Sequence, residues 1–198
     1  EALHILEETP NLASATETNG QLALAYMRLG QDDKARKYAQ KVIDLMGNTS
    51  PTVYSMNIGF TAVADVAFEL WEKALLSTPT TDSEQYKALA EKSLKLLKAF
   101  QGVFPIGQPA TPYYQGWYEM LTGKHDAALK SWQKGLEAAQ KFNMPYEEAL
   151  ARLKLGTHLK ENAETRKEHF ERALHLLEEM GRVSRLQLAK AEAQKAGF

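Results

Sequence analysis

The sequence predicts an all-α protein built from antiparallel helix pairs, and three observations lead to this fold class. Apolar residues recur at helical spacing almost throughout the chain, and no stretch alternates between apolar and polar residues. Short polar turns, several of them containing glycine, separate these stretches, so consecutive helices must run antiparallel. Small and apolar residues also return at matching offsets in segments of about 34 residues, which is typical of stacked helical repeats.

Capping residues and prolines mark where the predicted helices begin and end. Ser50 and Thr111 each precede a proline and can cap a helix that holds this proline in its first turn. Asp82 opens a capping box that ends at Gln85, and Gly181 closes a helix. The predicted helices cover roughly residues 1–8, 11–29, 32–46, 51–76, 83–100, 111–121, 125–142, 145–160, 164–180 and 183–196.

Four segments are predicted to be repeats, near residues 16–49, 51–101, 109–142 and 149–180. The segment 51–101 is irregular, because its first helix is too long for a unit of about 34 residues. The other three carry small or large apolar residues at matching offsets: Leu22, Ala23, Tyr26, Gly30, Ala35 and Ala39; Gly116, Gly123, Ala128, Trp132 and Gly135; Leu155, Gly156, Phe170, Ala173 and Leu176. These offsets are those of the tetratricopeptide repeat. The sequence therefore predicts one tetratricopeptide-like right-handed superhelix over residues 1–198.

An aromatic stripe in the third repeat is the candidate binding surface. This stripe follows helical spacing and consists of Tyr113, Tyr114, Trp117 and Met120. The offsets of Tyr113, Trp117 and Met120 face the concave side of such a superhelix. An aromatic and methionine groove would suit a helix or an extended peptide. The alternative is that the same residues are core and pack against the segment 102–109, and the sequence leaves both open.

Composition limits the partners that this chain can have. The net charge of −1 and the absence of a dominant basic face predict no binding to nucleic acid. The most apolar segment, 56–71, is short and contains Asp65 and Glu69, so no membrane span is expected. The chain has no cysteine, which excludes disulfides and thiolate metal sites and agrees with a reducing, cytoplasmic location. It also has no signal peptide and opens inside a predicted helix, so we expect a piece of a longer protein.

The residues that could carry catalysis are not arranged for it. His175 and Glu179 have the spacing of metal ligands on one helix face, but such pairs commonly only support a helix. Ser131 and Ser184 lack the glycine-rich turn that exposes a serine nucleophile. We therefore predict no catalytic residue, no cofactor and no metal.

The second half of the chain resembles one group of repeat regions more closely than the general consensus. It carries, in order, Phe104-Pro-Ile-Gly-Gln-Pro109, Tyr114-Gln-Gly-Trp117, Gly123-Lys-His-Asp-Ala-Ala-Leu129, Met144-Pro-Tyr-Glu-Glu-Ala-Leu150 and Glu168-His-Phe-Glu-Arg-Ala-Leu174. This order is similar to the C-terminal repeats of multidomain adenylate/guanylate cyclases, in which a cyclase and a large regulatory ATPase module precede the repeats.

This resemblance implies a regulatory role for the chain. The chain contains no phosphate-binding loop and no pair of metal-binding aspartates, so any cyclase or ATPase chemistry would lie upstream. The expected function is then a non-catalytic interaction module that binds a partner protein or the upstream domains of its own chain. The alternative is a free-standing scaffold that binds a peptide in its concave groove. The oligomeric state is left open.

Overall fold

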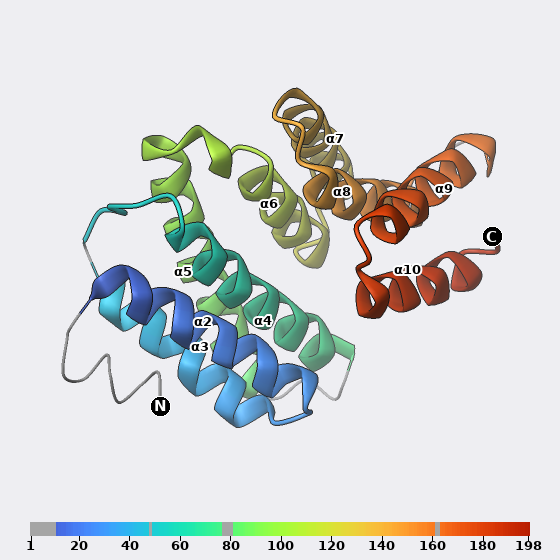
Figure 1. Ribbon diagram of the computed structural model, residues 1–198. Coiled ribbons are helices and arrows are strands. Elements are labelled where there is room, and N and C mark those ends of the chain that lie inside the picture. The colour runs from blue at the N-terminus through green and yellow to red at the C-terminus, as the bar shows by residue number, and fades with distance from the viewer. Residues whose placement is uncertain (1–10, 48, 77–80, 161–162) are drawn as a thin grey trace. The chain divides into compact units, whose positions relative to one another are not determined.

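The computed structural model describes residues 11–47, 49–76, 81–160 and 163–198 (Figure 1). All regular structure within these ranges is helical, which confirms the predicted all-α class. The helix predicted over residues 1–8 lies outside the described residues. None of the described helices combines the length and the apolar character that crossing a membrane requires.

The chain divides into two compact units, Glu1–Gly107 and Gln108–Phe198, and each is described by itself. The single superhelix expected over residues 1–198 stays a prediction. The helices of the first unit are α2 (Leu12–Arg28), α3 (Asp32–Met46), α4 (Met56–Leu76) and α5 (Thr81–Val103), followed by the 3₁₀ turn η1 (Pro105–Gly107). The helices of the second unit are α6 (Ala110–Leu121), α7 (His125–Lys141), α8 (Pro145–His158), α9 (Ala163–Glu179) and α10 (Val183–Lys195).

The predicted repeats fall on successive helix pairs. The segment 16–49 falls on α2 and α3, and 51–101 on α4 and α5. The segment 109–142 falls on α6 and α7, and 149–180 on α8 and α9. Within its own unit, each helix packs against the helix that follows it in the chain.

The first unit is built around α4, which is apolar on almost every side. Phe60, Phe68 and Trp71 of this helix are buried, together with Phe100 of α5. The rings of Phe60 and Phe100 meet edge to face, 5.9 Å apart. A helix that is hydrophobic all round belongs in a core, and α4 packs against α2, α3 and α5.

Helices α2 and α4 approach each other closely at two glycines. A β-carbon added to Gly20 would lie 2.6 Å from the carbonyl oxygen of Gly59, and one added to Gly59 would lie 2.6 Å from that of Thr16. Both distances are far below van der Waals contact, and the obstacles are backbone atoms that cannot turn aside. Only glycine therefore permits this crossing.

In the second unit, two helix pairs close by placing a glycine against an aromatic ring. A β-carbon on Gly116 of α6 would lie 2.6 Å from Nε1 of Trp132 on α7. A β-carbon on Gly156 of α8 would lie 3.1 Å from the ring of Phe170 on α9. Both rings are buried, and Trp132 Nε1 donates a hydrogen bond to the Tyr113 carbonyl at 3.0 Å. The predicted repeat offsets thus correspond to specific packing contacts.

Four of the connections have three residues and contain the same two-residue turn, whose second residue has positive φ. In each, a residue with positive φ follows the helix, and the next backbone N–H donates to a carbonyl five residues earlier. The residues with positive φ are Gly30, Gly123, Asn143 and Gly181. The corresponding N–H to O distances are 2.9 Å for Gln31 to Tyr26, 2.8 Å for Lys124 to Glu119, 2.8 Å for Met144 to Ala139 and 2.9 Å for Arg182 to Leu177.

Three helix starts differ from the sequence prediction. Helix α5 begins at Thr81 and not at residue 83, so Asp82 lies in the first turn of the helix and not at its N-cap. Helix α4 begins at Met56 and not at Pro51, because Pro51 is buried and the chain turns over residues 53–55 before the helix starts. Helix α6 begins at Ala110, with Pro109 as its N-cap residue. Because η1 and Pro109 already have helical backbone, Thr111 lies inside the helix and not at its N-cap.

Candidate functional site

The aromatic stripe predicted as a groove is buried. Tyr113, Tyr114 and Trp117 are 4%, 2% and 5% exposed, and Met120 is half-buried. The three rings contact one another, with Tyr114 and Trp117 stacked at 6.4 Å and Tyr113 edge-on to both. A ligand would therefore have to displace packed side chains to reach them.

Two basic residues of α8, not singled out from the sequence, contact tryptophans of α6 and α7. Lys154 Nζ lies 3.9 Å from the centre of the Trp117 ring, at cation–π distance. The His158 ring stacks on Trp132, with ring centres 5.1 Å apart. Lys154 and His158 are four residues apart, the spacing of one helix face, but sequence alone does not say which rings that face meets.

His158 is held in its neutral form. Burial, and to a lesser extent the charges of Lys154 and His125, lower its pKa from 6.5 to about 4. At neutral pH the imidazole is thus an uncharged stacking group and not a proton donor. Its role in the structure is to join α8 to α7.

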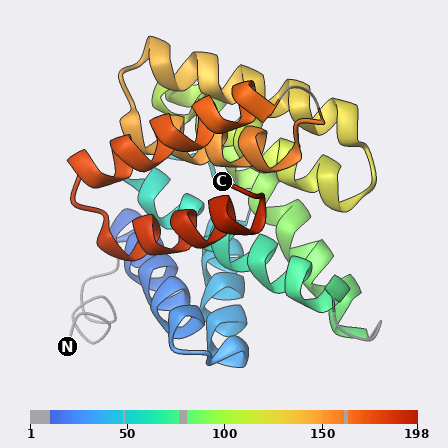
Figure 2. The same cartoon turned by 90° about the vertical axis from the view of Figure 1, so that its right-hand side faces the viewer.

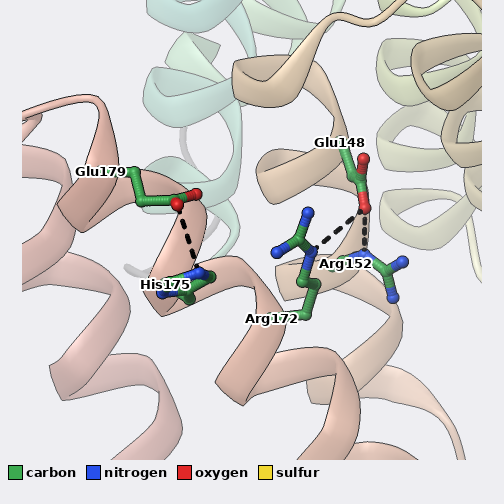
Figure 3. A network of polar contacts seen from close by, with 5 residues as sticks. All are labelled: Glu148, Arg152, Arg172, His175 and Glu179. Carbon is green, nitrogen blue, oxygen red and sulfur yellow. Dashed lines mark hydrogen bonds and ion pairs between the residues drawn. The ribbon is translucent and has the colours of Figure 1, made fainter.

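A network of charges joins α8 to α9 (Figure 3). Glu148 Oε1 accepts a hydrogen bond from Arg152 Nε at 2.8 Å, and Arg172 Nε of α9 lies 3.9 Å from the same oxygen. The Glu148 and Arg152 side chains are only 12% and 17% exposed. Water screens this enclosed pair within α8 less than a surface pair, and the half-exposed Arg172 extends the network to α9.

The candidate metal pair from the sequence is a separate surface contact. His175 Nε2 lies 3.3 Å from Glu179 Oε1, farther along α9, and both side chains are 56% exposed (Figure 3). In the part of the chain that the structure describes, no three histidine or acidic residues come together as metal ligands. This pair is an exposed contact within one helix, of the kind that adds little stability.

The serine of α7 is also used in packing. Ser131 Oγ donates to Glu119 Oε2 of α6 at 2.7 Å, and Gln115 Nε2 donates to the other oxygen of Glu119 at 2.9 Å. A serine nucleophile needs a base and an aligned oxyanion site. Here the hydroxyl ties α7 to α6.

A cavity of about 260 Å³ lies between α9 and α10. Its apolar lining comes from Phe170, Leu174, Ala193 and Phe198. Figure 2 shows these two helices side by side, in orange-red and red, with the C-terminal end of the chain beside α9. The cavity exists because α10 turns alanines, Ala189 and Ala193, toward the large side chains of α9.

Polar residues line the rest of the cavity, and more of them are positively than negatively charged. They are Lys167, Glu171, Lys190 and Gln194. Lys167 Nζ lies 3.7 Å from Glu171 Oε1, whereas Lys190 forms no ion pair with the described residues. The rim therefore carries one positive charge in excess. The sequence showed the lysines, but not the hollow that they border.

Comparison of the chain with protein-family models and with curated proteins gives no match. The function is therefore inferred from the residues and contacts described above.

Proposed function

We propose that this chain is a tetratricopeptide-like protein-interaction module without catalytic activity of its own. The observation that carries the proposal is the recurrence of one helix-pair design. The same two-residue turn appears four times, and a glycine facing a buried aromatic ring closes two successive pairs. Proteins built by repeating one helix pair form extended surfaces for binding other proteins.

The state of the polar residues supports a role without catalysis. Glu148, Arg172 and Ser131 are engaged in contacts between helices, and His158 is kept neutral chiefly by burial. The cavity between α9 and α10, at about 260 Å³, is smaller than the 300–1,000 Å³ that is typical of cofactor and small-metabolite pockets. A protein segment suits these surfaces better than a substrate does.

The finer proposal is that this module regulates a multidomain nucleotide-cyclase-like or ATPase-linked protein, and it rests on the resemblance of the second half. Many residues in those motifs are packing residues, such as Gly116, Ala128, Phe170 and Ala173. The shared motifs therefore directly support a shared helix packing. They support a shared signalling role only indirectly, because proteins with the same packing can share a role. A cytoplasmic location belongs to the same proposal.

Selection of peptides on the purified chain tests the interaction module. A random-peptide phage library is panned on the immobilised chain, and enriched peptides are synthesised and measured by fluorescence anisotropy. We expect peptides that converge on a common pattern and bind with saturable affinity. Failure to enrich any such pattern, with a correctly folded chain by circular dichroism, would contradict the proposal.

The size of the native protein tests the finer proposal. An antibody raised against the chain is used to blot extracts of the source cells. A band several times larger than 22.2 kDa is expected if cyclase or ATPase domains precede the repeats. A band near 22.2 kDa would favour the free-standing peptide-binding scaffold.

A further inference from the structure

We propose that the cavity between α9 and α10 binds an acidic segment of a partner protein that inserts one large apolar side chain. This inference rests on the proposed interaction function and adds to it a location and a partner chemistry. The location differs from the aromatic stripe of α6, which is buried.

The size of the cavity points to a single side chain as the occupant. An apolar cavity of about 150 Å³ is large enough to hold a benzene molecule. The cavity here, of about 260 Å³, therefore has room for one leucine, methionine or phenylalanine side chain. It lies below the range of about 300–1,000 Å³ in which whole cofactors and drug-sized ligands bind.

The lining provides the contacts that such a side chain needs. Phe170 forms the buried floor at 1% exposure, and Leu174 and Phe198 are half-buried around it. The rings of Phe170 and Phe198 meet with centres 5.5 Å apart. Aromatic and aliphatic walls that are already in place bind an apolar group without first being ordered.

The positive charge around the cavity favours acidic residues in the partner segment, beside the side chain that it inserts. Lys167 and Lys190 border the hollow, and Glu171 balances only one of them. Arg166 adds a further positive charge, because its guanidinium lies 5.2 Å from the centre of the Phe198 ring. A carboxylate beside the inserted side chain would meet Lys190, whereas a lysine there would be repelled.

Defined peptides test the chemistry of the partner. Short acetylated and amidated peptides carry leucine, phenylalanine or alanine at one position and aspartate, asparagine or lysine beside it. Binding to the full chain is measured by fluorescence anisotropy at low and high salt. We expect the leucine and phenylalanine peptides with aspartate to bind most tightly and to weaken about tenfold when aspartate becomes lysine. Equal binding of the alanine peptides, or preference for lysine, would overturn the inference.

Three variants test the location. Gln194→Trp places a ring over the cavity from an exposed position, and Lys190→Glu reverses a charge on its rim. Lys195→Glu is the matched control, since it makes the same change on the same helix at an exposed residue outside the lining. We expect Gln194→Trp to abolish binding. Lys190→Glu should weaken the aspartate peptides about tenfold and favour the lysine peptides, and Lys195→Glu should leave both unchanged.

The outcomes separate this inference from the proposed function. If library peptides bind the chain and their affinity is unchanged by Gln194→Trp and Lys190→Glu, the cavity is not their site and the interaction function stands. If neither the library nor the defined peptides bind, both are wrong. Binding of sodium octanoate without binding of any peptide would also overturn the inference, because the occupant would then be a small amphiphile.

Discussion

The first and second units differ in what lies between their helices. In the first unit the buried contacts are mainly apolar or backbone to backbone, with α4 buried on almost every side and Gly20 packed against Gly59. Its charged contacts between helices, such as the ion pair of Lys73 with Asp32, lie nearer the surface, where the Lys73 side chain is 67% exposed. In the second unit, charged and titratable side chains lie between the helices, as Lys154 on Trp117 and Glu148 near Arg172 show. Ionic contacts weaken when a partner is protonated or deprotonated and when salt screens the charges, whereas apolar side chains carry no charge to titrate or screen. The packing of the second unit should therefore respond more strongly to pH and salt than that of the first unit.

Gly59→Ala should produce the largest loss of stability, because it adds a β-carbon where α2 and α4 cross closely in the first unit. The added β-carbon would lie 2.6 Å from the Thr16 carbonyl oxygen, so α2 and α4 must move apart. We expect a loss of about 3 kcal/mol in the free energy of unfolding. Urea denaturation followed by circular dichroism measures it.

Gly102→Ala is the matched control for this change. A β-carbon on Gly102, near the end of α5, meets no atom within 4 Å. It should therefore leave stability unchanged or raise it slightly, since alanine favours a helix more than glycine does. Equal stability of Gly59→Ala and Gly102→Ala would show that the crossing is not rigid.

Glu148→Gln should have the next largest effect, and it acts on the second unit. The change removes the charge that Arg152 and Arg172 share, and Arg152 is too enclosed for water to replace it fully. We expect a loss of about 2 kcal/mol. Glu179→Gln, which breaks the exposed contact with His175, should change stability by less than about 0.5 kcal/mol in the same urea assay. Equal losses would mean that the Glu148 network has no special role.

Acid should destabilise the second unit through His158. Its pKa is 6.5 in the unfolded chain and about 4 in the folded one, so the unfolded state binds the proton more readily. The neutral ring contributes its full share to the free energy of unfolding above pH 6.5. This contribution decreases as the pH drops from 6.5 toward 4, and it changes no further below pH 4. His169, whose pKa is also lowered by burial and by Arg152, acts in the same direction.

The variant His158→Phe isolates this contribution to acid sensitivity. Phenylalanine keeps a ring to stack on Trp132 but carries no proton. Burial raises the pKa of Glu147, which opposes the histidines in acid, so only the difference between variant and wild type is informative. The melting temperature of the variant should fall less steeply between pH 6.5 and 4. Parallel curves would refute a role for His158.

Lys154→Met should have the smallest effect on stability and a clear effect on titration. Methionine keeps most of the packing on Trp117 and removes the cation, so the loss should be about 0.5–1 kcal/mol. Removing this charge should also raise the pKa of His158, because Lys154 helps to lower it. Titration of the His158 ring by NMR measures the shift. An unchanged pKa would show that the Lys154 charge does not help to set its value.

The helices could be predicted from the sequence where local chemistry decides them. Gly30, Gly123 and Gly181 occupy left-handed positions that favour glycine, so the turns at these residues follow from composition. The start of α4 could not be predicted, because Pro51 looks like a first-turn proline until its burial is known. Local patterns do not contain that tertiary information.

The candidate site was harder to predict, since it depends on which faces meet. Tyr113 and Trp117 share a face by spacing alone, but whether anything covers this face is decided by other elements. Lys154 and Trp117 are far apart in sequence, and neither reveals the other. The cavity depends on Ala193 lying opposite Phe170, where a larger residue would fill it. No local sequence pattern marks where a cavity will form.

The repeated two-residue turn has a consequence for how this chain can vary in length. Each turn satisfies its backbone groups through a fixed ring of hydrogen bonds, such as Arg182 N–H to the Leu177 carbonyl. One inserted residue would break that ring and redirect the following helix. Natural insertions and deletions in related chains should therefore spare these four turns and gather in longer connections such as 49–55.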